Sequence, residues 1–237
     1  MIYPRKSLLF ERLFLIGLRW TIRRRFFGVF VKGMQHLETA TARKAPLLIC
    51  SNHTNWWDGF AAGMLVPRFT GHSIHIAQYE LLIRKYPVCR WLGAFAIDLD
   101  GSPLPGLRYA LKLLEKPENA VWIFPQGVIL PQREPIVVKP GATWLAEKRG
   151  AWLLPVLFHY DWMLESRPSI FVHCGPALPP GTSPEKLQAE MQRLYDAMVA
   201  DMHPLEIDDY QPLYPPKPSL NRRWDWLLGR DLDRVRN

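Results

Sequence analysis

Residues 46–60 read PLLICSNHTNWWDGF, and the fold can be predicted outward from this stretch. The apolar run at 46–50 is too short for a stable helix and is typical of a strand buried on both faces of a parallel sheet. Polar residues follow at once, and a helical pattern then covers 58–65 and ends before Pro67. A strand that leads through a short loop into a helix is the unit of an α/β fold.

The same alternation continues along the chain. We expect further strands at 73–77, 95–97, 120–124, 152–158 and 170–173, and helices at 79–91 (with a break near Pro87), 107–114, 141–148 and 183–202. The last helix has a strong start signal, because Ser183 stands at its N-cap and Pro184 at its first position. The pattern predicts an α/β fold with a central mixed, largely parallel sheet wrapped by helices.

The positive charge is concentrated at the start of the chain. Residues 1–33 hold eight basic side chains and one acidic side chain, whereas the rest of the chain holds 22 basic and 21 acidic side chains. A nucleic-acid enzyme usually carries a basic groove on its body. The near-neutral body therefore argues against a nucleic-acid partner.

Residues 5–31 predict an amphipathic helical arm, either one helix or a hairpin bent near 23–28. Its apolar stripe contains Leu9, Leu13, Ile16 and Trp20. Basic residues beside large apolar ones are typical of helices that bind anionic lipid surfaces, although a helix docked on the protein's own core is the alternative. The side chains expected to bind the membrane are Arg12, Arg19, Trp20, Arg23, Arg24, Arg25, Phe26 and Phe27.

The arm is expected to lie on a membrane rather than to cross it. Every twenty-residue window across 7–31 contains several charged side chains, and each arginine at the centre of a span costs about 2.5–3.5 kcal/mol. No secretory signal is evident, and the three cysteines show no C-x-x-C spacing, so we expect reduced thiols. These features favour a peripheral or monotopic protein at the cytoplasmic face.

The chain divides by composition into three parts. The arm covers 1–33, the main domain 34–205, and a Pro-rich extension with a basic tail 206–237. The tail contains Arg222, Arg223, Trp224 and Trp226, which predicts either a second membrane contact or a disordered end.

The chemistry is predicted to lie where the first strand ends. Ligands bind outside the carboxyl ends of the strands in open α/β sheets, and His53 stands at such an end. Asp58 follows in the first turn of the helix, from which its carboxylate can turn back to orient the imidazole. Such a pair can work as a general base that takes a proton from a hydroxyl group. Residues 124–127 (FPQG) end a second strand in the same way.

Five blocks in this order resemble the lysophospholipid acyltransferase-like family, the glycerolipid acyltransferases with H-x4-D and FPxG motifs. They are NHTNWWDG at 52–59, GAFAID at 93–98, FPQG at 124–127, KPGATWLA at 139–146 and LPV at 154–156. The resemblance covers about residues 45–160. It implies catalytic roles for His53 and Asp58, and a substrate-binding role for Asn52, Gly93, Phe95, Asp98, Phe124, Pro125, Gln126, Gly127, Lys139 and Gly141.

The resemblance also implies the reaction. A fatty acyl group would move from an acyl thioester, acyl-CoA or acyl carrier protein, to a hydroxyl of a lipid acceptor at the membrane surface, with no metal and no further cofactor. A non-catalytic lipid-binding protein on the same fold is the alternative from another class.

Two departures from the family pattern bear on the acceptor. Leu99 stands where an arginine usually follows the second block, and Gln126 replaces the usual glutamate of the third. Without that arginine a phosphate monoester is disfavoured, although Arg108, Arg133 or Lys139 could substitute. A glycolipid, a glycosylated isoprenoid or carotenoid, a lysophospholipid and a free alcohol all fit, and phosphatidate synthesis from 1-acylglycerol-3-phosphate is the main alternative.

Overall fold

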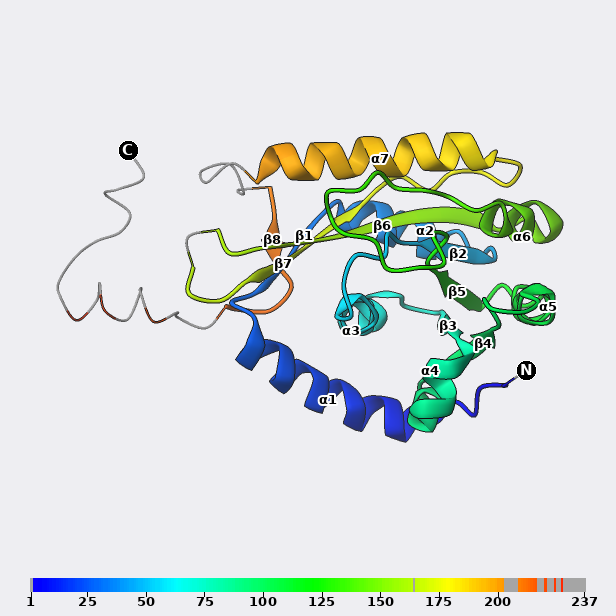
Figure 1. The fold of residues 1–237 in the computed structure, drawn as a ribbon, viewed down its shortest axis with the longest axis horizontal. Coiled ribbons are helices and arrows are strands. Elements are labelled where there is room, and N and C mark those ends of the chain that lie inside the picture. Colours follow the sequence, from blue (N-terminus) through cyan, green and yellow to red (C-terminus); the bar gives the residue numbers. More distant parts are fainter. Residues whose placement is uncertain are drawn as a thin grey trace.

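The computed structural model describes residues 2–163, 165–202, 209–216, 220, 224 and 227. Within them, eight strands form one sheet in the order β4-β3-β5-β2-β6-β7-β1-β8 (Figure 1). The strands are β1 (Val29–Lys32), β2 (Leu47–Cys50), β3 (Ser73–Tyr79), β4 (Phe95–Ile97), β5 (Asn119–Ile123), β6 (Trp152–Asp161), β7 (Ser169–Cys174) and β8 (Gln211–Pro212).

Most neighbouring strands are parallel. Only the β6–β7 and β1–β8 pairs are antiparallel among those described. In the centre, Cys50 of β2 pairs with Ile123 of β5 on one side and with Pro155 of β6 on the other. The predicted mixed, largely parallel α/β sheet is confirmed, and the chain leaves β2 and β5 at the same edge.

Helices cover both faces of this sheet (Figure 1). The helices α5 (Leu104–Leu113), α6 (Gly141–Arg149) and α7 (Pro184–Asp201) pack on one face, and α1 (Leu8–Arg25), α2 (Met34–Ala42) and α3 (Asp58–Leu65) on the other. The strand β2 shows why, because Leu48 and Cys50 join the first core and Leu47 and Ile49 the second. A strand apolar on both sides needs a helical layer on each.

The helix predicted for 5–31 is wrong in its last six residues, 26–31. α1 ends at Arg25, and Val29–Lys32 is a strand inside the sheet, parallel to β7. Residues 26–31 alternate between the two cores, with Phe27 and Phe30 in one and Phe26, Val29 and Val31 in the other. Burial on both faces, together with β-branched valines, overrides the helical pattern.

Smaller differences occur elsewhere. The helix expected at 79–91 breaks before Pro87 as predicted, where α4 (Glu80–Lys85) gives way to a 3-10 helix over Pro87–Leu92, but Tyr79 belongs to the end of β3. A second 3-10 helix covers Val66–Arg68, and α2 lies in a segment without a prediction. Part of the expected extension joins the sheet as β8. Of the four tail residues, Arg222, Arg223 and Trp226 lie outside the described residues, and Trp224 is exposed.

Candidate active site

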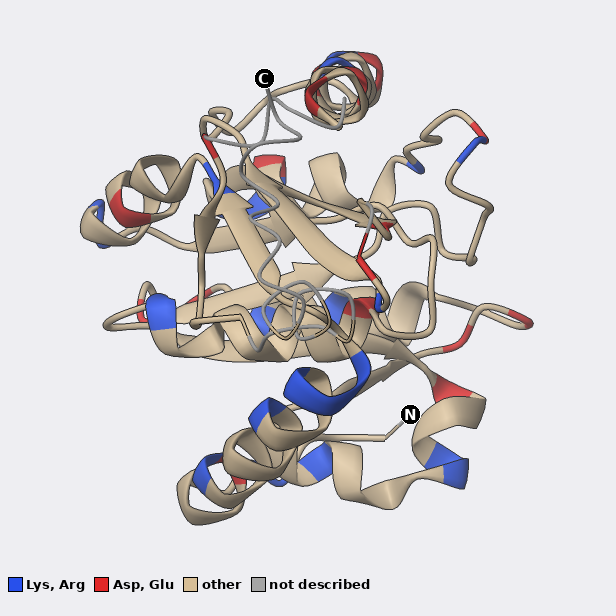
Figure 2. Cartoon of the chain, turned by 90° about the vertical axis from the view of Figure 1, so that its left-hand side faces the viewer, with Lys and Arg blue, Asp and Glu red and all other residues tan. Residues whose placement is uncertain are grey.

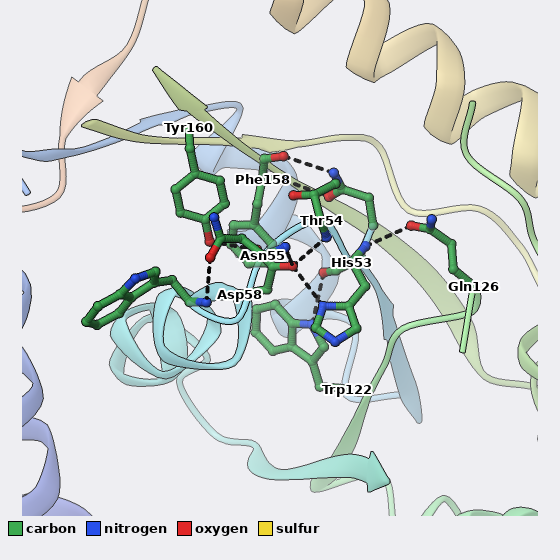
Figure 3. A network of polar contacts seen from close by, with 11 residues as sticks. His53, Thr54, Asn55, Asp58, Trp122, Gln126, Phe158 and Tyr160 are labelled. Carbon is green, nitrogen blue, oxygen red and sulfur yellow. Dashed lines mark hydrogen bonds and ion pairs between the residues drawn. The ribbon is translucent and has the colours of Figure 1, made fainter. Parts of the chain in front are cut away.

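The two predicted loops meet at the carboxyl edge of the sheet (Figure 3). The Gln126 side chain accepts a hydrogen bond from the His53 backbone N–H through Oε1, at 2.7 Å. The His53 ring stacks on Phe124, with the ring centroids 4.4 Å apart. The His53 carbonyl also accepts from the Leu130 N–H at 2.9 Å. The loop after β5 therefore fixes the backbone and the ring of His53.

Asp58, the first residue of α3, holds the other side of the imidazole. Its Oδ2 lies 2.8 Å from His53 Nδ1 and accepts the backbone N–H groups of Thr54 at 2.7 Å and Asn55 at 2.9 Å. Its Oδ1 accepts the Tyr160 hydroxyl at 2.6 Å. The carboxylate is fully buried, and four donors compensate for its removal from water.

This geometry defines the state in which His53 can act as a base. A carboxylate only accepts hydrogen bonds, so Nδ1 carries the proton that faces Asp58. Nε2 then keeps its lone pair, and the His53 side chain is 24% exposed. A partly exposed imidazole with an orienting carboxylate can remove a proton from a substrate hydroxyl.

Two residues assigned to substrate binding instead hold the fold together. Asn52 is 1% exposed, and its side chain donates to the Phe158 carbonyl and accepts from the Phe158 N–H. Phe95 is wholly buried in the core beside Tyr109. The predicted substrate contacts of both side chains are wrong, because a block shared by a family contains core residues as well as site residues.

The other named residues of the second block flank β4, with Gly93 before the strand and Asp98 directly after it. Gly93 has a φ of 89°, and a Cβ there would lie 2.8 Å from the Ile74 carbonyl oxygen, so this position requires glycine. Asp98 accepts the Gly101 N–H at 3.0 Å and shapes the following loop. Leu99 is 41% exposed in that loop, between Asp98 and Asp100. A half-exposed leucine thus stands where a phosphate-binding arginine would be expected.

Lys139 and Gly141 lie beside the third block. The Lys139 N–H donates to the Pro125 carbonyl at 3.1 Å. The Lys139 ammonium lies next to Gly127, since a Cβ at that glycine would be 3.1 Å from Nζ. Gly141 starts α6 against Leu107. Pro125 is buried, Phe124 and Gly127 are half-buried, and Lys139 is exposed, so Lys139 is the basic side chain held against this loop.

The predicted membrane residues separate into two groups. Arg12, Arg19, Trp20, Arg24 and Arg25 are exposed, and Arg23 is half-buried. Phe26 and Phe27 are only 4% and 8% exposed and belong to the two cores. A membrane contact by these two phenylalanines is therefore wrong.

Sequence reasoning did not single out Tyr160. It comes from the end of β6, far from the motifs, and reaches Asp58 only because β6 lies beside β2. Burial, followed by the charge of Asp58, raises the pKa of the Tyr160 phenol well above its usual value. The phenol therefore stays protonated and donates to Asp58.

The cysteines do not extend the site. All three are free, with Cys50 and Cys174 buried. Burial raises the pKa of the Cys174 thiol to about 12, which disfavours the nucleophilic thiolate. In the part of the chain that the structure describes, no three His, Cys, Asp or Glu side chains are grouped to hold a metal ion.

Comparison with known proteins identifies the class. The model of the Acyltransferase family matches residues 28–159, which is more than half of the chain. The chain therefore belongs to the Acyltransferase family, as the motif resemblance predicts.

Among solved structures, the fold is similar to that of the 1-acyl-sn-glycerophosphate (LPA) acyltransferase PlsC from Thermotoga maritima. The TM-score is 0.56 and the sequence identity 20%, over 82% of this chain and 78% of that chain. This similarity confirms the shared fold.

Proposed function

We propose that the protein transfers a fatty acyl group from an acyl thioester, acyl-CoA or acyl carrier protein, to a hydroxyl group of a lipid acceptor at a membrane surface. The observation that carries this proposal is the buried Asp58 carboxylate on His53 Nδ1, with Nε2 left free beside the third block. A thioester is already activated, so the enzyme needs a base and no covalent intermediate.

The reaction needs one proton transfer in each direction. His53 Nε2 takes the proton of the acceptor hydroxyl as its oxygen attacks the thioester carbonyl carbon. The imidazolium that forms is stabilised by the adjacent Asp58 carboxylate. The attack gives a tetrahedral intermediate on the substrate. When this intermediate collapses, the C–S bond breaks and the leaving thiolate takes the proton from the His53 imidazolium. The products are the acylated lipid and the free thiol, and His53 is neutral again.

We further propose that the acceptor presents an uncharged, hydroxylated head group such as a sugar. A phosphate monoester carries close to two negative charges at neutral pH and needs donors of opposite charge. The loop after β4 offers Leu99 between two acidic residues, Asp98 and Asp100. Arg133 is 86% exposed on the side chain and faces Glu134. Lys139 beside Gly127 is the feature that favours the phosphate alternative.

One assay tests both the reaction and the acceptor. Purified protein, one acyl thioester, and vesicles with either lysophosphatidate or a non-acylated glycolipid are mixed, and released thiol and acylated lipid are both measured. We expect thiol release that depends on the acceptor, with equal amounts of acylated lipid, and a higher kcat/KM for the glycolipid. Vesicle binding without acceptor-dependent thiol release would instead support a non-catalytic lipid-binding protein. A preference of about tenfold or more for lysophosphatidate, about 1.4 kcal/mol at the transition state, would show that Leu99 has been misread.

The membrane surface is proposed from the free face of α1. The core side of this helix buries Leu18 and Ile22, whereas Leu9, Leu13, Ile16 and Trp20 are 60–71% exposed. Arg12, Arg19 and Arg24 border this stripe, and Figure 2 shows Lys and Arg along the helix. An apolar stripe between arginines is suited to the boundary between head groups and acyl chains. No helix among the described residues is long and apolar enough to span a bilayer.

The same face continues toward the catalytic pair. Trp56, three residues after His53, is 56% exposed and contacts Phe60, whose ring lies 6.5 Å from Phe14 of α1. A membrane bound to α1 would therefore lie beside the site where a lipid acceptor must enter. We place this surface at the cytoplasmic face, where the free cysteines would remain reduced.

Substitution of Leu9, Ile16 and Trp20 by serine should weaken binding to anionic vesicles by about tenfold or more, because three exposed apolar side chains leave the lipid boundary. Vesicle sedimentation measures the effect. High salt should also weaken vesicle binding by the wild-type protein, because it screens the arginines of α1. The control is Val199→Ser on α7, an exposed apolar residue on the opposite face of the sheet. Equal sedimentation of all three proteins would show that α1 is not the membrane contact.

A further inference from the structure

We infer that Tyr160 is a positioning residue for the catalytic pair, which acts through Asp58 and sets the pH at which the pair takes up a proton. This inference rests on the proposed function for its kinetic consequence, but its geometry does not depend on the substrate. The three donors from the β2–α3 segment, His53 Nδ1 and the Thr54 and Asn55 N–H groups, all reach Oδ2. Among the described residues, the Tyr160 hydroxyl is the one donor that reaches Oδ1.

Tyr160 is held in place independently of Asp58. Gln132, in the loop after the third block, accepts from the Tyr160 N–H at 2.8 Å and donates to the Tyr160 carbonyl at 3.2 Å. The phenol ring lies against Phe26, with the centroids 6.2 Å apart, and Phe26 in turn packs edge-on against Trp57. The hydroxyl is therefore positioned by β6, by the loop after the third block and by the residue that follows α1. Its position does not depend on the hydrogen bond to Asp58.

Few ionisable groups face the carboxylate. His53 comes from the loop before α3 and Tyr160 from β6. Tyr195 of α7 lies farther away and binds the Gln132 carbonyl and His159 Nδ1. Burial, followed by the charge of Asp58, raises the pKa of Tyr195 to about 12, so it also remains neutral. The ionisable groups in direct contact with Asp58 among the described residues are therefore His53 and Tyr160.

The direction of the effect on proton uptake follows from the loss of the hydrogen bond to Asp58 Oδ1. Loss of the Tyr160 hydroxyl leaves this oxygen buried without its donor and makes the anion less stable. Uptake of a proton by the pair then becomes more favourable, whether the imidazole or the carboxylate receives it. More of the pair is protonated at neutral pH, so less base is available.

Tyr160→Phe removes this hydroxyl and keeps the ring against Phe26. We expect kcat/KM to fall by roughly tenfold and the acid limb of its pH profile to move up by roughly one pH unit, as expected for loss of a hydrogen bond to a charged group. The matched control is Tyr210→Phe, since Tyr210 is also buried and donates to a carboxylate, Asp201, away from the site. This control should leave both quantities unchanged.

A second measurement separates positioning from a general structural role. In an Asp58→Asn background, Tyr160→Phe should have little further effect, because the charge it acts on is gone. The same tenfold loss in that background, or an unmoved acid limb in folded Tyr160→Phe protein, would overturn the inference. If the wild-type protein shows no acceptor-dependent thiol release, the proposed function fails. An NMR titration of the His53 imidazole, assigned by its loss in His53→Ala, still decides whether Tyr160→Phe raises the midpoint or leaves it unchanged.

Discussion

Replacing His53 by alanine is expected to lower kcat for acyl transfer by about 10²–10⁴-fold, the usual contribution of a positioned general base. The imidazole belongs to a partly exposed side chain, and a buried carboxylate holds its Nδ1. The fold should survive, because the ring is half-exposed and its main packing partner is the single ring of Phe124. Initial rates of thiol release at saturating donor measure the effect.

The control for this substitution is His36→Ala, which removes a similarly half-buried imidazole from α2. It should retain wild-type turnover. Near-wild-type turnover in folded His53→Ala protein would show that the base is another group and would remove the central part of the mechanism.

The position of the catalytic pair could be predicted because its cause is local. His53 and Asp58 are five residues apart, and a strand, a short loop and a helix suffice to bring them together. The meeting of the two loops could also be anticipated in part, since parallel strands release their carboxyl ends at one edge. The two loops are in direct contact because β2 pairs with β5, and no local sequence pattern determines that pairing.

The errors share one physical origin, which is burial. Asn52 and Phe95 stand inside family blocks, yet the former joins two strands and the latter fills the core. Phe26 and Phe27 continue an apolar pattern that fits an exposed amphipathic helix and a doubly buried strand equally well. Only the tertiary structure decides which apolar residues have a partner. Tyr160 was missed for the same reason, because its contact with Asp58 joins positions 102 residues apart.

Asp58→Asn is expected to lower kcat by about 10²-fold, and the contacts of the carboxylate indicate why the loss should be smaller than for His53→Ala. An asparagine has one oxygen and one NH₂ group to place. The Thr54 and Asn55 N–H groups both point at the Oδ2 position, so the amide oxygen is favoured there and the NH₂ group would face Tyr160. His53 Nδ1 would then still find an acceptor.

The Asp58→Asn protein therefore keeps the required tautomer and loses only the negative charge beside the imidazolium. Two results follow from that distinction. The acid limb of the pH profile should move down, because the pair has lost the charge that favours proton uptake, and ¹⁵N NMR of the imidazole should still show a proton on Nδ1. The control is Asp201→Asn, which neutralises a carboxylate bound to Tyr210 and Lys32 away from the site. If the spectrum shows the proton on Nε2 instead, the amide has turned its NH₂ group toward His53, and the loss of kcat should then equal or exceed that of His53→Ala.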